Sequence, residues 1–293
     1  MQLAALAHLI RLPLSLMVAV TALAGALAVP GPVPGPVPGL TLWALGWGVF
    51  LLAAASSVFN QVQERASDAL MRRTAGRPLA CGLLSARAGT AIGLLLGSGG
   101  LAILVAGTGA RPALLGLVTL AWYLAVYTPL KRLTSLAVLA GTPCGAVPPL
   151  LGWLAGGGLF PAPQPLALAL FMLLWQVPHY WLLALPDRDE LRSAGFRVLP
   201  ELSERQLLAV SQRWLLGLTL ATLLLPTLDL PATPQLQRLL VGLALALAAA
   251  ASWLCHQSLF PAQTARRLRR LLHLYLALVL LVLLTDALTK VPS

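Results

Sequence analysis

The feature that most constrains the fold is a series of apolar segments, each about as long as a membrane is thick. The segments fall roughly at residues 9–29, 40–59, 83–107, 112–129, 134–157, 165–185, 207–226, 236–254 and 270–289. A helix of about 20 apolar residues crosses the hydrocarbon core of a bilayer, and helices satisfy their own backbone hydrogen bonds there. The sequence therefore predicts an all-α polytopic membrane protein with about nine transmembrane helices, forming one domain over residues 1–293.

Composition excludes an ordinary soluble domain. Hydrophobic residues make up 58% of the chain and charged residues only 10%, and the mean hydropathy is +0.84. The first apolar segment is interrupted early by Arg11 alone, so we interpret it as a retained membrane span and not as a signal peptide. Cys81, Cys144 and Cys255 are scattered, which indicates neither a disulfide framework nor a zinc site. The Val-Pro-Gly-Pro repeat at 29–39 predicts an extended linker without chemistry of its own.

The distribution of basic residues predicts the orientation of the chain in the membrane. A net charge of +11 could suggest nucleic acid, but the basic residues lie in short loops between apolar segments, so no nucleic-acid partner is expected. With nine spans, only Arg111, Arg238 and Lys290 fall on one side, which leaves 17 of the 20 Lys and Arg residues on the other. Positive residues accumulate on the cytoplasmic side. The N-terminus is therefore predicted to be cytoplasmic, and the C-terminus to lie across the membrane.

A strongly polar stretch of the chain runs from residue 60 to residue 78 and follows the second span. Asn60, Glu64 and Asp68 recur every four residues, so on a helix they lie on one face over about 12 Å. Arg72 continues this stripe, and further arginines follow. Oxygen donors followed by guanidinium groups suit a hard divalent cation that carries a polyanionic ligand. A solvated face remains the plainer alternative for such a loop when it occurs alone.

A second acidic group, Asp187, Asp189 and Glu190, follows the sixth span on the same predicted side of the membrane. Seven of the nine acidic residues share that side, and only Asp229 and Asp286 lie opposite. Mg²⁺ in proteins is usually held by one or two carboxylates together with substrate phosphates. The two acidic groups are therefore predicted to face each other across a cavity and to hold a metal diphosphate between them.

Five motifs between residues 60 and 200 resemble the protoheme IX farnesyltransferases (heme O synthases), a branch of the UbiA superfamily of intramembrane prenyltransferases. The first has the pattern Asn-x-x-x-Glu-x-x-x-Asp-x-x-Met-x-Arg-Thr-x-x-Arg-Pro over residues 60–78. Tyr-Thr-x-x-Lys-Arg-x-Thr starts at Tyr127, and Gly-Ala-x-Pro-Pro-x-x-Gly-Trp starts at Gly145. Trp-Gln-x-Pro-His ends at His179, and Ala-Gly-x-x-x-Leu-Pro ends at Pro200. Two positions depart from the pattern: Glu190-Leu191 replaces Asp-Tyr, and Ala137 replaces an asparagine.

The resemblance implies a nine-helix fold around a central cavity, in the inner membrane of a cell. The implied reaction is Mg²⁺-dependent transfer of the farnesyl group of farnesyl diphosphate to the vinyl group of heme b, on the cytoplasmic side. A heme A synthase or an oxidase assembly is the kind of downstream partner that it implies. The residues to which it assigns catalysis are Asn60, Glu64, Asp68 and Lys131. Those for the metal are Asn60, Glu64, Asp68, Asp187, Asp189 and Glu190; those for the substrates are Arg72, Arg73, Arg77, Arg132, Tyr127 and His179.

Two other functions stay open at this point. The same chemistry could prenylate an aromatic quinone precursor or a chlorin, although Glu64 and the Pro178-His179 pair favour heme. A non-catalytic heme or lipid transporter or scaffold belongs to a different class. A transporter needs ionisable residues near the middle of the membrane, whereas the charges of this chain gather at the ends of its spans. His179 is a porphyrin contact or an iron ligand in the functional reading, and a packing residue in the plainer one.

Overall fold

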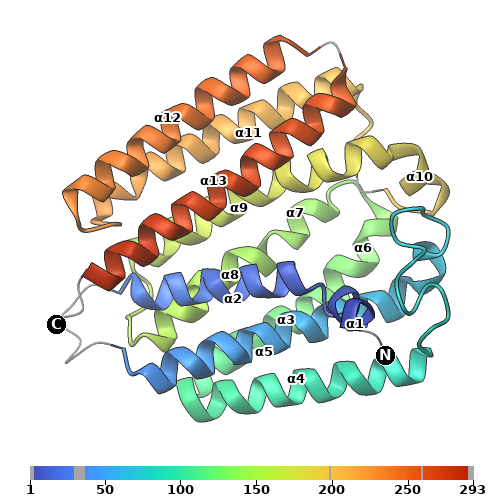
Figure 1. Ribbon diagram of the computed structural model, residues 1–293, viewed down its shortest axis with the longest axis horizontal. Helices are drawn as coiled ribbons and strands as arrows, with labels where there is room; N and C mark the ends of the chain where they lie inside the picture. The colour runs from blue at the N-terminus through green and yellow to red at the C-terminus, as the bar shows by residue number, and fades with distance from the viewer. Residues whose placement is uncertain (1–2, 30–36, 198, 259, 290–293) are drawn as a thin grey trace.

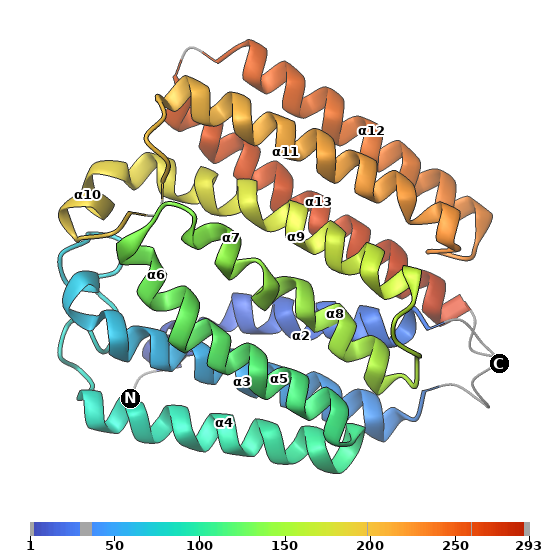
Figure 2. The same ribbon diagram turned by 180° about the vertical axis from the view of Figure 1, so that it is seen from behind.

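A computed structural model describes residues 3–29, 37–197, 199–258 and 260–289 of the chain. Within these residues the protein is built from helices and contains no strand, which confirms the predicted all-α class (Figures 1 and 2). The longer helices run side by side, and short helical pieces gather at one end. That end carries α10 and the loop that follows α3 (Figure 1).

The bounds of the elements are as follows. The first half contains α1 (Leu3–Leu9), α2 (Leu12–Leu27), α3 (Gly39–Asp68), α4 (Ala86–Thr108), α5 (Ala110–Trp122), the π-helical turn η1 (Tyr123–Tyr127), α6 (Thr128–Leu133), α7 (Ala137–Gly141) and α8 (Pro143–Ala155). The second half contains α9 (Pro163–Ala184), the 3₁₀ turn η2 (Leu185–Asp187), α10 (Arg188–Ser193), α11 (Glu204–Leu224), the 3₁₀ turn η3 (Pro226–Leu228), α12 (Pro234–His256) and α13 (Pro261–Thr289).

Each of the nine predicted spans corresponds to an apolar helical segment in the described part of the chain. Eight segments are long and apolar enough to cross a membrane, and α2, with 16 residues, is a shorter apolar helix. Two predicted boundaries were wrong. α3 continues past residue 59 to Asp68, and α13 begins at Pro261 and not at residue 270. The added residues of both helices are polar, so a hydropathy pattern does not assign them to a span. Most of the predicted linker, residues 30–36, lies outside the described residues.

Most of the buried apolar side chains among the described residues fall into two hydrophobic clusters. One is formed by α9, α11, α12 and α13, with the buried side chains of Phe171, Trp175 and Leu276 near its centre. The other is formed by α2, α3, α4, α5 and α8 around Leu45, Leu104 and other buried aliphatic residues. α8 and α9 pack directly against each other and so join the two groups (Figure 2).

A break between α1 and α2 turns a charged side chain inwards. Pro13 has no N–H to bond to the carbonyl of Leu9, so a single helix cannot run through this point. Arg11 adopts the left-handed conformation, with φ 46°. The carbonyl of Leu9 instead accepts a hydrogen bond from Gln61 Nε2 at 2.6 Å. The break is therefore held by α3, at the level of the Asn60 to Asp68 stripe.

Close packing of α2 against α8 depends on glycine, and Gly152 tests it. A Cβ atom at Gly152 would collide with the backbone carbonyl of Ala22, and neither backbone can move independently of its helix. We expect Gly152→Ala to destabilise the protein by about 1–3 kcal/mol, measured as a lower thermal midpoint in detergent. Gly242→Ala in α12 is the matched control, because no atom lies within 4 Å of its added Cβ. Equal midpoints for the two variants would contradict the close packing.

Candidate active site

A polar pocket of about 140 Å³ lies where α3, the following loop, α6 and the α1–α2 break meet. The carboxylates of Glu64 and Asp68 line it from the last turns of α3. Its lining cations are Arg11, Arg73, Arg77 and Lys131. Residues 60, 64 and 68 do lie on one helix, as the four-residue spacing predicted. The pocket therefore combines two carboxylates with four cations from three separate parts of the chain.

Both carboxylates are paired with a cation inside the pocket. Lys131 Nζ lies 2.6 Å from Glu64 Oε1, and Arg77 Nη1 lies 2.7 Å from Asp68 Oδ2. The side chains of Glu64 and Asp68 are only 7% and 2% exposed. The loop after α3 returns Arg77 to Asp68 because Thr74 Oγ1 donates a hydrogen bond to the Asp68 carbonyl, at 2.8 Å. Such pairs compensate the buried charges.

Of the two remaining cations, Arg73 pairs with Asp187 outside the pocket lining, and Arg11 contacts an amide. Arg11 Nη2 donates to the Asn60 amide oxygen at 3.0 Å, while Asn60 Nδ2 is buried without a hydrogen-bond acceptor. The pKa of Arg77, in the loop after α3, is lowered, first by burial and then by the charge of Arg11. Positive charge is thus crowded at this point. An anionic oxygen placed here would relieve the crowding and could accept a hydrogen bond from Asn60.

The second acidic group meets the first motif through arginines. Arg72 Nε lies 3.0 Å from Glu190 Oε1, and Arg73 Nε lies 3.1 Å from Asp187 Oδ2. The prediction that Arg72 continues the helical stripe was wrong, because α3 ends at Asp68. The Arg72 side chain is 97% exposed. Asp189 is exposed as well. Among the described residues, no three His, Cys, Asp or Glu side chains are grouped so that they could hold one metal ion.

An apolar cavity of about 260 Å³ lies next to the polar pocket, between the helices. It runs between α2, α3, α5, α8 and α9, past Val18, Val49 and Leu151. The two spaces share the lining residues Arg11, Tyr127, Lys131, Tyr180 and Leu183. A charged head and an apolar tail of one ligand could therefore be bound together, with the junction of head and tail at these residues.

Aromatic side chains surround the junction. Tyr127 lies 5.4 Å from Tyr123 and 6.2 Å from Tyr180, measured between ring centroids. The Lys131 ammonium lies 4.9 Å from the Tyr127 ring centroid. Tyr123 and Tyr127 belong to the π-helical turn η1, where Pro129 supplies no N–H to the carbonyl four residues before it. Wide turns of this kind are frequent at functional sites.

His179 lies in the wall of the apolar cavity, one residue after the helix-interior Pro178. Its ring stacks on Trp175 at 4.6 Å, and the edge of His273 from α13 approaches it at 4.8 Å between centroids. The Nδ1 atom of His179 is buried and has no hydrogen-bond partner. An unpartnered buried nitrogen is costly, so this geometry suits a ligand contact better than a packing role.

Three features of this region were not predicted from the sequence. Arg11 was interpreted only as an orientation signal, although a lone arginine in an apolar segment is itself a sign of function. Tyr123 and Tyr180 carry no signal of their own, since tyrosine is common near span ends. Arg132, expected beside the diphosphate, lines a neighbouring groove and donates to Ser67 Oγ at 3.0 Å.

Comparison with known proteins settles the family. The UbiA prenyltransferase family matches residues 18–285. The chain is 44% identical over 225 residues to the protoheme IX farnesyltransferase of Geobacter sulfurreducens, which covers 76% of this chain and 81% of that protein. The chain belongs to the UbiA prenyltransferase family. A second protoheme IX farnesyltransferase, from Nitratidesulfovibrio vulgaris strain DP4, is 38% identical to this chain. The match covers 96% of this chain and 94% of that protein.

Solved structures of the UbiA family share the fold. A digeranylgeranylglyceryl phosphate synthase superposes with a TM-score of 0.75 at 17% identity, over 98% of this chain and 99% of its own. A UbiA homologue from Archaeoglobus fulgidus bound to GPP and Mg²⁺ superposes with a TM-score of 0.68 at 16% identity, over 95% and 99% of the two chains. This UbiA chain is therefore a multi-pass membrane prenyltransferase.

Proposed function

We propose that this protein transfers the farnesyl group of farnesyl diphosphate to the vinyl group of heme b and so produces heme O. The observation that carries the proposal is that the cationic pocket and the apolar cavity share five lining residues, an arrangement that suits a diphosphate head and a prenyl tail. The names of the relatives support heme b as the acceptor. The proposal places this pocket at the cytoplasmic face, because 17 of the 20 basic residues are predicted on that side.

The residues of the polar pocket fit a magnesium diphosphate. Glu64 and Asp68 supply the one or two carboxylates that Mg²⁺ typically takes from a protein. Asp187 and Glu190 hold Arg73 and Arg72 at the rim and are the second candidates for a metal contact. When bound, Mg²⁺ neutralises the diphosphate and makes it a better leaving group. The structure of the Archaeoglobus homologue with GPP and Mg²⁺ supports this assignment.

The chain's own residues account for the remaining chemistry. Arg11, Arg73, Arg77 and Lys131 stabilise the diphosphate as the allylic C–O bond breaks and the electron pair leaves with oxygen. The farnesyl cation forms at the junction, where the faces of Tyr123, Tyr127 and Tyr180 stabilise it and exclude water. The terminal vinyl carbon of heme b attacks this cation. A water oxygen then bonds to the inner vinyl carbon and loses a proton, which completes the hydroxyethylfarnesyl group.

Diphosphate release with a panel of acceptors tests the proposal. Purified protein is incubated with farnesyl diphosphate and either heme b, an aromatic quinone precursor or a chlorin, with and without Mg²⁺. We expect release that requires both Mg²⁺ and heme b. Diphosphate release with the quinone precursor or the chlorin, but not with heme b, would show that heme b is not the acceptor. No diphosphate release with any acceptor would favour a transporter or scaffold. Among the described residues, ion pairs cluster at one end of the helices and not at mid-membrane, which favours the enzyme.

The length of the apolar cavity makes a separate prediction about the donor. Val49 lines the cavity 11 residues before Asn60, roughly 16 Å along α3. We expect Val49→Trp to fill this end of the cavity and to shift donor preference from farnesyl towards geranyl diphosphate by at least about 10-fold in kcat/KM, which corresponds to about 1.4 kcal/mol. Val118→Trp, on the exposed face of α5, is the matched control. An unchanged preference in Val49→Trp would place the prenyl tail elsewhere.

A further inference from the structure

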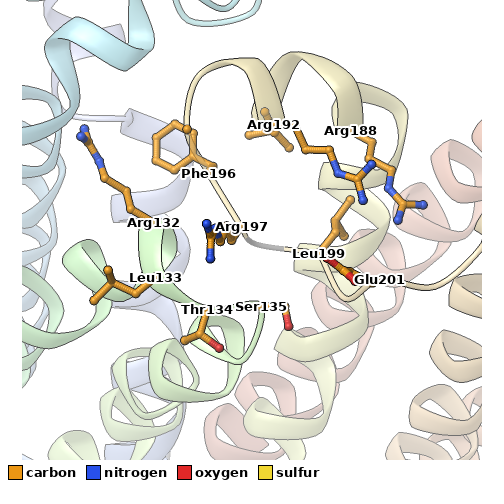
Figure 3. A pocket seen from close by; sticks show the side chains of 12 residues that line it. Arg132, Leu133, Thr134, Ser135, Arg188, Arg192, Phe196, Arg197, Leu199 and Glu201 are labelled. Atoms are coloured by element: carbon orange, nitrogen blue, oxygen red, sulfur yellow. The ribbon is translucent and has the colours of Figure 1, made fainter.

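A second, larger groove lies beside the polar pocket and has no role in the reaction described so far. Its volume is about 850 Å³, within the range of ligand sites. Four arginines line it: Arg132 from α6, Arg188 and Arg192 from α10, and Arg197 from the loop that follows (Figure 3). Glu201 is the acidic residue in its lining. The groove therefore carries an excess of three positive charges, counted over the described residues that line it.

Most of these arginines are available to a ligand. Arg188 is engaged, because its guanidinium donates to the carbonyls of Leu202 at 2.7 Å and Pro200 at 3.4 Å. Arg132, Arg192 and Arg197 have no carboxylate within ion-pair distance among the described residues, and all three are exposed. Guanidinium groups bind carboxylates through paired hydrogen bonds. Unpaired arginines around a groove are the arrangement that a ligand with carboxylates requires.

Apolar side chains provide a surface between the arginines. Phe196 and Leu199 lie in the groove lining, and the Arg132 guanidinium stands 5.8 Å from the centroid of the Phe196 ring (Figure 3). The Arg197 backbone N–H donates to the carbonyl of Lys131 at 2.8 Å. This bond ties the groove loop to the residue that pairs with Glu64. The groove lining thus combines apolar residues with arginines, and its loop is tied to the reaction pocket.

The groove and the polar pocket are neighbours. Leu191 and Phe196 line both spaces, so a large planar ligand in the groove has one edge at the pocket. The carboxylates Glu64 and Asp68 line only the pocket. A magnesium diphosphate therefore belongs to the pocket, and the groove suits an anion that needs no metal.

We propose that this groove binds the propionate groups of the tetrapyrrole acceptor. The vinyl and propionate substituents lie on opposite sides of the porphyrin ring. Arg192 and Arg197, with Arg132, hold the propionates, and the opposite edge presents a vinyl group at the Leu191 and Phe196 boundary. The inference rests on the proposed function for its acceptor. It gives these arginines a role in selecting the acceptor, whereas the charge pattern of the sequence explains them by membrane orientation alone.

The test compares heme b with its dimethyl ester, in which both propionates are neutral. For the wild-type protein we expect a KM at least about 10-fold lower for heme b than for the ester, because hydrogen bonds from guanidinium groups to carboxylates are stronger than those to a neutral ester. The double variant Arg192→Gln/Arg197→Gln should lose this preference and keep its KM for farnesyl diphosphate. Arg87→Gln, an exposed arginine at the start of α4, is the matched control and should behave as wild type.

Two outcomes separate this inference from the proposed function. If the wild type converts heme b and the double variant keeps the full preference over the ester, the groove does not bind propionates. Spectroscopic titration of heme b and its ester, without farnesyl diphosphate, gives a readout that needs no turnover. The wild type could bind heme b more tightly than the ester, lose this difference in affinity in Arg192→Gln/Arg197→Gln, and yet form no product. That result would support propionate binding in the groove and contradict the proposed reaction. Equal binding of both compounds by the wild type overturns the groove assignment.

Discussion

Asp68→Asn is expected to lower turnover by about 10³-fold or more while the protein remains folded in the membrane. Asp68 is 2% exposed and lines the polar pocket with Glu64. Asparagine keeps the shape of the side chain and one oxygen, but it removes the charge that would hold Mg²⁺ and that pairs with Arg77. Loss of a single electrostatic contact to a developing charge typically costs about 10²–10³-fold in rate, and weaker metal binding adds to this.

The measurement is the rate of diphosphate release as a function of Mg²⁺ concentration. Asp229→Asn is the matched control, because it makes the same chemical change at a residue outside the pocket. Asp229 has a left-handed backbone, with φ 57°, which asparagine also tolerates. The control should retain wild-type turnover. Wild-type turnover and Mg²⁺ dependence in Asp68→Asn would remove Asp68 from the metal site.

Glu64→Gln is expected to destabilise the protein by about 3–5 kcal/mol, because it leaves the buried Lys131 ammonium without its carboxylate. The Lys131 and Glu64 side chains are 11% and 7% exposed and lie 2.6 Å apart. The double variant Glu64→Gln/Lys131→Met removes both charges. It should regain most of the lost thermal stability and remain inactive, since the reaction needs the cation and the carboxylate.

Thermal midpoints and turnover of Glu64→Gln, Lys131→Met and the double variant separate structure from catalysis. A buried pair replaced by neutral groups of similar size is often no less stable than the original. Additive destabilisation in the double variant would show that the two charges act independently. Turnover in the double variant would mean that this pair is not part of the reaction machinery.

The arrangement of spans followed from the sequence because hydropathy alone determines which segments can enter a bilayer. The boundaries at residue 59 and residue 270 were wrong for the same reason. The last turns of α3 and the first turns of α13 are polar and helical, and hydropathy treats them as loops. The stripe of Asn60, Glu64 and Asp68 was predicted because it needs only the helical period. The prediction that Arg72 continues this stripe was wrong, because it depends on where the helix ends and α3 ends at Asp68.

Contacts between distant parts of the chain were beyond sequence reasoning. Arg11 reaches Asn60 only because Pro13 breaks the first helix and Gln61 holds the break. The second acidic group was expected to face the first across a cavity, and in the structure Asp187 and Glu190 meet the first motif through ion pairs with Arg73 and Arg72. Charge counting assigned the groove arginines to membrane orientation, since it contains no information on which of them share a cavity.

The mass of the product tests the central claim most directly. Purified protein is given heme b, farnesyl diphosphate and Mg²⁺, and the tetrapyrroles are separated by chromatography and weighed by mass spectrometry. The proposed reaction predicts a new tetrapyrrole with the mass of heme b plus one farnesyl group and one hydroxyl group, absent without Mg²⁺ and absent in Asp68→Asn. Recovery of heme b unchanged from folded wild-type protein, with both substrates and Mg²⁺ present, would contradict it.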